Sequence, residues 1–202
     1  MKKIFALITL SLLIGSIWAA VGCDLNDPDK DVRRLFTGSA SYKTSYRSIK
    51  KEGGKALLTK IESQLGDKFS GLYETIDVPY TLYEVYNGKT KLGYIHGVNQ
   101  KGYYGGIQIF LSLDNKGVIT NMYFQKFSSK KVKLYQDIAF TKQFIGLSIK
   151  DFAAYDVVKG KGGGKAAAIK DPSKGTDTDF IAIMRGVKKN LVLMEHFGTW
   201  NK

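Results

Sequence analysis

The sequence contains one cysteine, two histidines and three prolines among its 202 residues. A single cysteine excludes a disulfide framework, and it excludes zinc and iron–sulfur sites built from several thiolates. Two histidines leave little material for a histidine-based metal centre. The 22 glycines follow no regular period. The irregular glycine spacing excludes a collagen-like chain, and the low number of prolines excludes a proline-rich chain.

The composition is that of a folded, basic protein. Hydrophobic residues make up 44% of the chain and charged residues 24%, and the length suits one domain with a tail. Lysine and arginine outnumber aspartate and glutamate by 31 to 18, which gives a formal net charge of +13 at pH 7. Because the lysines are spread along the chain, we do not expect a nucleic-acid-binding protein. Anionic lipid headgroups explain the charge more simply, and an acidic redox partner is a second explanation.

The N-terminus has the pattern of a bacterial lipoprotein signal peptide. A short basic start precedes the apolar residues 4–20, and small residues lead to Cys23. The only cysteine stands where the lipobox requires the residue that is lipidated and becomes the mature N-terminus, although Ala20 replaces the usual leucine. We predict removal of residues 1–22, lipid attachment at Cys23, and a membrane-anchored protein of the cell envelope that faces the periplasm or the cell exterior. The alternatives are an ordinary signal peptide and an uncleaved N-terminal helix.

The mature chain is predicted to have two parts. Residues 23–54 are polar and show no clear hydrophobic period, so we predict a lipid anchor followed by a polar tether with one short helix. Residues 55–202 are predicted to form one domain. It begins with a short helix whose apolar face contains Leu57, Ile61 and Leu65, and Gly66 is a suitable stop for that helix.

The remaining pattern predicts strands followed by a packed helix. Four short strands are expected over residues 80–86, 92–98, 104–113 and 118–127, with turns at Asn87–Gly88 and 114–117. Two short helical pieces are expected at 140–144 and 149–155, and a flexible glycine-rich loop at 159–165. A long helix is expected from Asp179 to about Phe197. The predicted fold class is therefore α+β. A largely antiparallel β-meander sheet packs against helices, and a long amphipathic helix ends the chain.

Three short motifs follow one another in the strand region. They are Leu92–Gly93–Tyr94, then Gly102–Tyr103–Tyr104–Gly105–Gly106–Ile107, then the hairpin from Ile109 to Thr120. The second is similar to the GYxGxI motif, and the third to the D-x-x-G-x-I-T hairpin, of the FMN-binding domain in the G subunit of Rnf complexes and the C subunit of sodium-pumping quinone reductases. The resemblance covers about residues 55–197. It implies the fold of that domain and electron transport by a bound flavin.

The family attaches FMN through a phosphoester to the last threonine of an S-G-A-T motif before its final helix. Here a gapless match puts Asp177 at that position, and a carboxylate cannot form the ester. A one-residue deletion puts Thr176 there instead. By resemblance, the cofactor site then contains Thr176, Thr178, Gly175, Tyr103, Tyr104 and Gly105, with a tyrosine stacked on the flavin. Without the resemblance, Thr176 or Thr178 is only a helix N-cap.

Other motifs predict little chemistry. The family's E-T-P-G segment is replaced by residues 124–131, which contain no glutamate, proline or glycine. Residues 159–165 do not match a P-loop, because lysine stands at its first glycine position and alanine at its serine or threonine position. His96 and His196 have no partners in sequence, so we expect them at the surface or at a helix end, and no catalytic residue is predicted.

Three functions therefore stay open. The first is an exported, lipid-anchored flavoprotein that passes electrons between membrane-bound redox partners rather than turning over a substrate of its own. The second is a flavin-free lipoprotein that keeps the fold as a binding module. The third is an unrelated envelope lipoprotein that binds a small apolar ligand.

Overall fold

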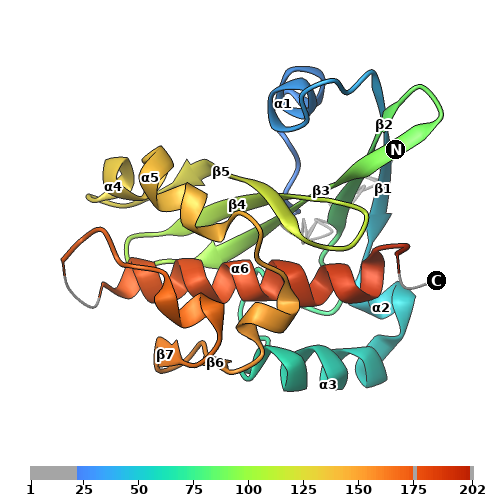
Figure 1. Ribbon diagram of the computed structural model, residues 1–202. Helices are drawn as coiled ribbons and strands as arrows, with labels where there is room; N and C mark the ends of the chain where they lie inside the picture. The colour runs from blue at the N-terminus through green and yellow to red at the C-terminus, as the bar shows by residue number, and fades with distance from the viewer. Residues whose placement is uncertain (1–21, 175–176, 201–202) are drawn as a thin grey trace, which may run out of the picture.

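The computed structural model describes residues 22–174 and 177–200. Its centre is a five-stranded antiparallel sheet in which each strand pairs with the next one along the chain (Figure 1). The strands are β1 (Ser41–Arg47), β2 (Tyr80–Asn87), β3 (Thr90–Lys101), β4 (Gly106–Leu113) and β5 (Ile119–Phe127). This order confirms the predicted α+β class and the antiparallel meander.

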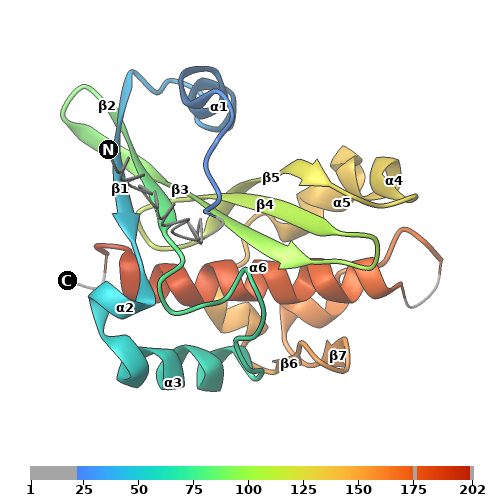
Figure 2. The ribbon, with the colours of Figure 1, turned by 180° about the vertical axis from the view of Figure 1, so that it is seen from behind.

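Helices lie on both sides of the sheet (Figures 1 and 2). They are α1 (Pro28–Leu35), α2 (Ile49–Glu52), α3 (Gly54–Leu65), α4 (Val132–Gln136), α5 (Ile138–Thr141) and α6 (Thr178–Phe197). Short 3-10 helices span Lys142–Phe144, Ile149–Phe152 and Lys165–Ala168. The predicted loop over residues 159–165 contains β7 (Lys161–Gly162), which pairs with β6 (Tyr155–Asp156). Within the described ranges, no helix has the length and hydropathy that crossing a bilayer requires.

The long C-terminal helix α6 runs through the middle of the molecule. The sheet covers one side of it, and α3 with the β6–β7 ribbon lies on the other side (Figure 1). Gly186 lets the helix approach β4 closely, because a Cβ at this position would lie 2.5 Å from Cδ1 of Ile109. The prediction of this helix is confirmed, but it is covered on two sides rather than on one.

Burial of α6 brings charged side chains into the core. The Nζ atom of Lys189, which is fully buried, donates to the Glu74 carboxylate at 2.8 Å and to the Asn99 carbonyl at 2.6 Å. Arg185 donates to the same carboxylate at 2.6 Å. Burial opposes the charge on Glu74, but the Arg185 hydrogen bond and both cations lower its pKa to about 2. Burial lowers the pKa of Lys189 to about 8, although the Glu74 carboxylate acts to raise it. These bonds join α6 to β3 and to the segment before β2.

The prediction of a tether over residues 23–54 is wrong for a large part of that segment. β1 pairs with β2 along its whole length, from Ser41 opposite Tyr86 to Arg47 opposite Tyr80. β1 is an edge strand that is exposed or half-exposed at every position, so its sequence shows no buried face. The backbone hydrogen bonds that hold such a strand leave no hydrophobic period in the sequence.

The segment before β1 covers the face of the sheet opposite α6. Cys23, Leu25, Val32 and Leu35 pack there against a cluster of strand residues, Tyr83, Val85, Ile95 and Phe110. The Leu25 N–H donates to the Tyr83 hydroxyl at 3.1 Å. Figure 2 shows α1, the one short helix predicted in this segment, above the sheet with α6 below it. The segment from Leu25 to Phe36 is therefore part of the folded domain.

The expectation for one histidine is also wrong. His96 lies between the sheet and α6 and is fully buried, with Nδ1 2.8 Å from Oδ1 of Asn190. Burial lowers its pKa to about 4, so the ring is neutral at pH 7. His196 lies near the end of α6, as expected, with Nε2 2.8 Å from Oε1 of Gln64.

Candidate functional site

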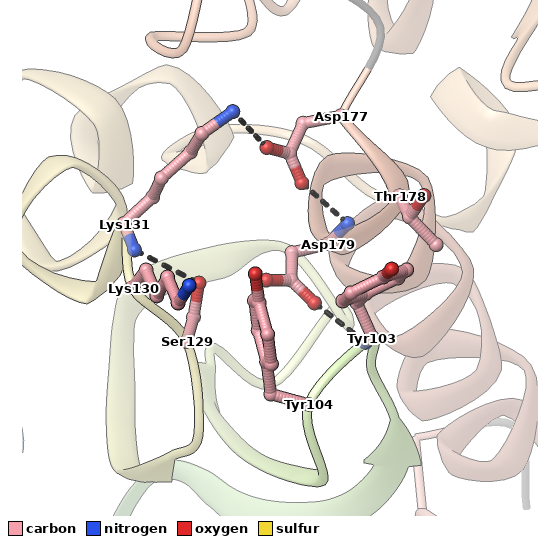
Figure 3. A pocket seen from close by; sticks show the side chains of 8 residues that line it. All are labelled: Tyr103, Tyr104, Ser129, Lys130, Lys131, Asp177, Thr178 and Asp179. Atoms are coloured by element: carbon pink, nitrogen blue, oxygen red, sulfur yellow. Dashed lines mark hydrogen bonds and ion pairs between the residues drawn. The ribbon is translucent and has the colours of Figure 1, made fainter.

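A pocket of about 340 Å³ opens at the N-terminus of α6 (Figure 3). Its walls come from the β3–β4 turn, from the segment that follows β5 and from the first residues of the helix. The lining residues are Tyr103, Tyr104, Ser129, Lys130, Lys131, Asp177, Thr178 and Asp179. The volume lies at the lower end of the range for small-molecule sites, which is about 300–1,000 Å³.

The β3–β4 turn presents two aromatic rings at the pocket. The Gly102 N–H donates to the Gly105 carbonyl at 2.7 Å, and Gly105 has φ of +159°, a value at which a side chain would also meet Ser128 at 3.0 Å. This tight turn leaves the side chains of Tyr103 and Tyr104 67% and 53% exposed. Their ring centroids lie 4.7 Å apart in an edge-to-face arrangement. Two exposed tyrosines beside a pocket offer an aromatic surface to a planar ligand.

Asp179 ties this turn to the start of α6. Its carboxylate is 2% exposed and accepts a hydrogen bond of 2.8 Å from the Tyr103 N–H. A side chain at Gly102 would lie 2.8 Å from the same carboxylate, so glycine permits the close approach. The aromatic pair is therefore held at a defined place relative to the helix N-terminus.

Asp177 is the N-cap of α6, rather than the threonine that the local pattern favoured. One carboxylate oxygen accepts from the Asp179 N–H at 2.7 Å, and the other pairs with the Lys131 ammonium (Figure 3). Partial burial opposes its charge, but the Lys131 bond and the backbone N–H groups lower the pKa of Asp177 below its ordinary value. The same bond raises the pKa of Lys131. Both groups are therefore charged at neutral pH.

The pocket also contains a cation outside this ion pair. The Lys130 Nζ lies 5.5 Å from the centroid of the Tyr104 ring. Together with Lys131, it gives one wall of the pocket two positive charges, opposite two carboxylates on the helix side. Such a site suits a ligand that has a planar ring and an anionic group. Within residues 22–174 and 177–200, no cluster of three or more histidine, cysteine, aspartate or glutamate side chains could hold a metal ion.

The structure brings together several of the residues predicted from sequence. Tyr103, Tyr104 and Thr178 line the pocket, and Gly105 forms the turn beneath it. Gly175 and Thr176 directly precede Asp177 in the sequence and lie outside the described residues. Cys23 is elsewhere, buried against the opposite face of the sheet.

Sequence analysis missed the wall formed by residues 129–131. This wall occupies the place in the chain where the family has its E-T-P-G segment. The run Ser128–Ser129–Lys130–Lys131 was visible as a departure from that motif, but nothing in it indicated a contact with residue 177. Comparison with known proteins adds no assignment, since no protein-family model matches the chain and no curated protein is significantly similar to it in sequence.

Proposed function

We propose that this protein is an exported, lipid-anchored flavoprotein that binds FMN and passes electrons between membrane-bound redox partners in the bacterial cell envelope. One observation carries the proposal. Tyr103, Tyr104 and Thr178 come from segments far apart in the sequence, were selected by resemblance to the FMN-binding domain, and line one pocket.

The described residues of the pocket fit this cofactor. The tyrosine rings provide a surface for the isoalloxazine ring, while Lys130, which is outside the Asp177–Lys131 ion pair, provides positive charge for the phosphate. The pocket lies at the N-terminus of a 20-residue helix, whose dipole favours an anion. Bound FMN would supply electron transfer, and the protein would orient it and set its potential.

Flavin content tests this function. The full chain, extracted in neutral detergent from flavin-replete cells, is expected to show the visible absorbance of flavin. Tyr103→Ala with Tyr104→Ala removes the aromatic surface, so this double variant should lose at least about tenfold in FMN affinity, corresponding to about 1.4 kcal/mol. The matched control is Tyr46→Ala on β1, a side chain that is 59% exposed and does not line the pocket. A colourless wild-type protein that also fails to bind added FMN would contradict the proposal.

A second function is favoured by one specific observation. The Asp177 carboxylate already accepts the N–H of Asp179 at the start of α6 and already pairs with the Lys131 ammonium. A phosphate at this position would need the same N–H group and the same ammonium. This arrangement favours a flavin-free lipoprotein that keeps the fold as a binding module. A colourless, folded protein would support this second function.

Lipid attachment at Cys23 belongs to both functions. The cysteine side chain is 2% exposed, and burial raises the pKa of its thiol to about 12. A diacylglycerol group on that sulfur does not fit inside the cluster of Tyr83, Val85 and Ile95. The lipidated residue must therefore lie outside this cluster, while α1 can stay in place on the sheet.

A further inference from the structure

We propose that the exposed side of α4 and α5 is a docking surface for an acidic protein. The docking surface consists of Leu134, Ile138, Lys130, Lys133 and Lys142. This inference rests on the proposed function, since it identifies the occupant as the redox partner that exchanges electrons with the neighbouring pocket.

Large apolar side chains point to solvent on these helices. Tyr135 and Phe140 are buried on the inner side, whereas Leu134 is 43% exposed and Ile138 is 66% exposed. One such residue would be ordinary on any protein surface. Here two of them lie on adjoining helices, four residues apart in the sequence, and form an apolar patch that a partner can cover.

The charges around this apolar patch are mostly positive. Residues 130–145 contain four lysines and one carboxylate, that of Asp137. Asp137 is engaged as the N-cap of α5, where it accepts from the Ala139 N–H at 2.7 Å. Lys130, Lys133 and Lys142 are exposed, and none forms an ion pair with any residue that the structure describes. An apolar centre with a lysine rim is complementary to a partner with acidic residues around an apolar spot.

The docking surface is continuous with the pocket. Lys130 belongs to both, and α4 begins one residue after Lys131. In Figure 1, α4 and α5 lie at the same end of the molecule as the N-terminus of α6. A protein seated here would lie beside the cofactor site, whereas a bilayer pressed on the same surface would obstruct access to it. The position therefore favours an acidic protein over an anionic membrane.

Peptide binding tests the docking surface without requiring flavin. The probe is a fluorescein-labelled, glutamate-rich peptide with two leucines, and its anisotropy is measured with the full chain in neutral detergent. We expect salt-sensitive binding that Lys133→Glu with Lys142→Glu weakens about tenfold at low ionic strength. The matched control is Lys50→Glu with Lys51→Glu, two exposed lysines at α2, and it should change affinity less than threefold. Ile138→Ser should weaken binding severalfold and leave the salt dependence unchanged.

Three outcomes would overturn the inference. The first is equal loss of binding in the control, which would indicate only diffuse charge. The second is unchanged binding in the Lys133 and Lys142 variant. The third is that this variant weakens binding to phosphatidylglycerol vesicles more than it weakens binding to the peptide, which would indicate a membrane surface. Because Lys133, Ile138 and Lys142 do not line the pocket, flavin content should be the same in all variants. Failure of docking can therefore be distinguished from failure of flavin binding.

Discussion

Asp177 links the two walls of the pocket through a cap and an ion pair. Replacement by asparagine keeps a good N-cap but removes the charge that pairs with Lys131. The Lys131 end of the pair is 46% exposed, so we expect a loss of at most about 1 kcal/mol in the free energy of unfolding at pH 7.

The pH dependence of this Asp177→Asn effect has a defined sign. The folded-state pKa of Asp177 is lowered, so its charge stabilises the protein above the unfolded value of about 3.9. That contribution disappears as pH falls through the lowered pKa. Urea unfolding should therefore separate wild type from Asp177→Asn at pH 7 and bring the two together at low pH. A difference that grew on acidification would contradict the ion pair.

His96 is predicted to make the fold sensitive to mild acid. Its pKa is lowered from 6.5 to about 4, so the unfolded chain binds a proton that the folded chain excludes. The contribution of the neutral His96 ring to the free energy of unfolding is complete above pH 6.5 and falls by about 3 kcal/mol as the pH drops to 4. His96→Gln can keep a bond to Asn190 and does not titrate. As the pH falls over this range, wild type should lose unfolding free energy relative to His96→Gln. A difference between the two proteins that stays constant would contradict burial of the ring.

Some site residues were predictable from local sequence, and others were not. Tyr103, Tyr104 and Thr178 occur in short motifs, so resemblance alone selected them. The pairing of Lys131 with Asp177 joins residues far apart in the chain, and it depends on how the β5–α4 connection meets α6. No local pattern contains that information.

At the scale of elements, the segment from α1 to β1 determines where the domain begins. Leu35 is 6% exposed and packs with Val32 on the sheet face opposite α6. Leu35→Ala should lower the free energy of unfolding by about 2–4 kcal/mol, the usual cost of truncating a buried leucine. The matched control Leu134→Ala, at a position 43% exposed, should cost less than about 1 kcal/mol. Equal, small losses in chemical denaturation would mean that α1 is part of a tether after all.

Elements with a strong hydrophobic period were predicted well. α3 with its stop at Gly66 and the helix α6 agree with the sequence pattern. The predicted hairpin is also present, although its turn is Gly88–Lys89, one residue later than Asn87–Gly88. β1 was missed because an edge strand exposed on both faces has no such period. α1 was expected as one short helix, but its packing on the sheet was not, because Val32 and Leu35 are the only large apolar side chains among its eight residues.

At the scale of the whole molecule, α6 connects the core to the pocket. Its middle contains the buried Lys189 and Arg185, which share Glu74, and its first turn forms one wall of the pocket. Sequence analysis predicted an amphipathic helix, which has one apolar face to bury. The network shows instead that these charges are paired inside the fold. The same rigid helix holds the pocket, the sheet and α3 together.

The central claim is that the pocket at the start of α6 holds FMN, and mass spectrometry of one peptide tests it most directly. The full chain is produced in cells that export it in the presence of a flavin transferase, and the tryptic peptide 175–185 is weighed. We predict an FMN-sized mass increment in wild type and in the matched control Thr90→Ala, an exposed threonine at the start of β3 that does not line the pocket. We predict no increment on this peptide in Thr176→Ala. A wild-type peptide of unmodified mass, from a folded and colourless protein, would contradict the flavoprotein account and leave the flavin-free binding module.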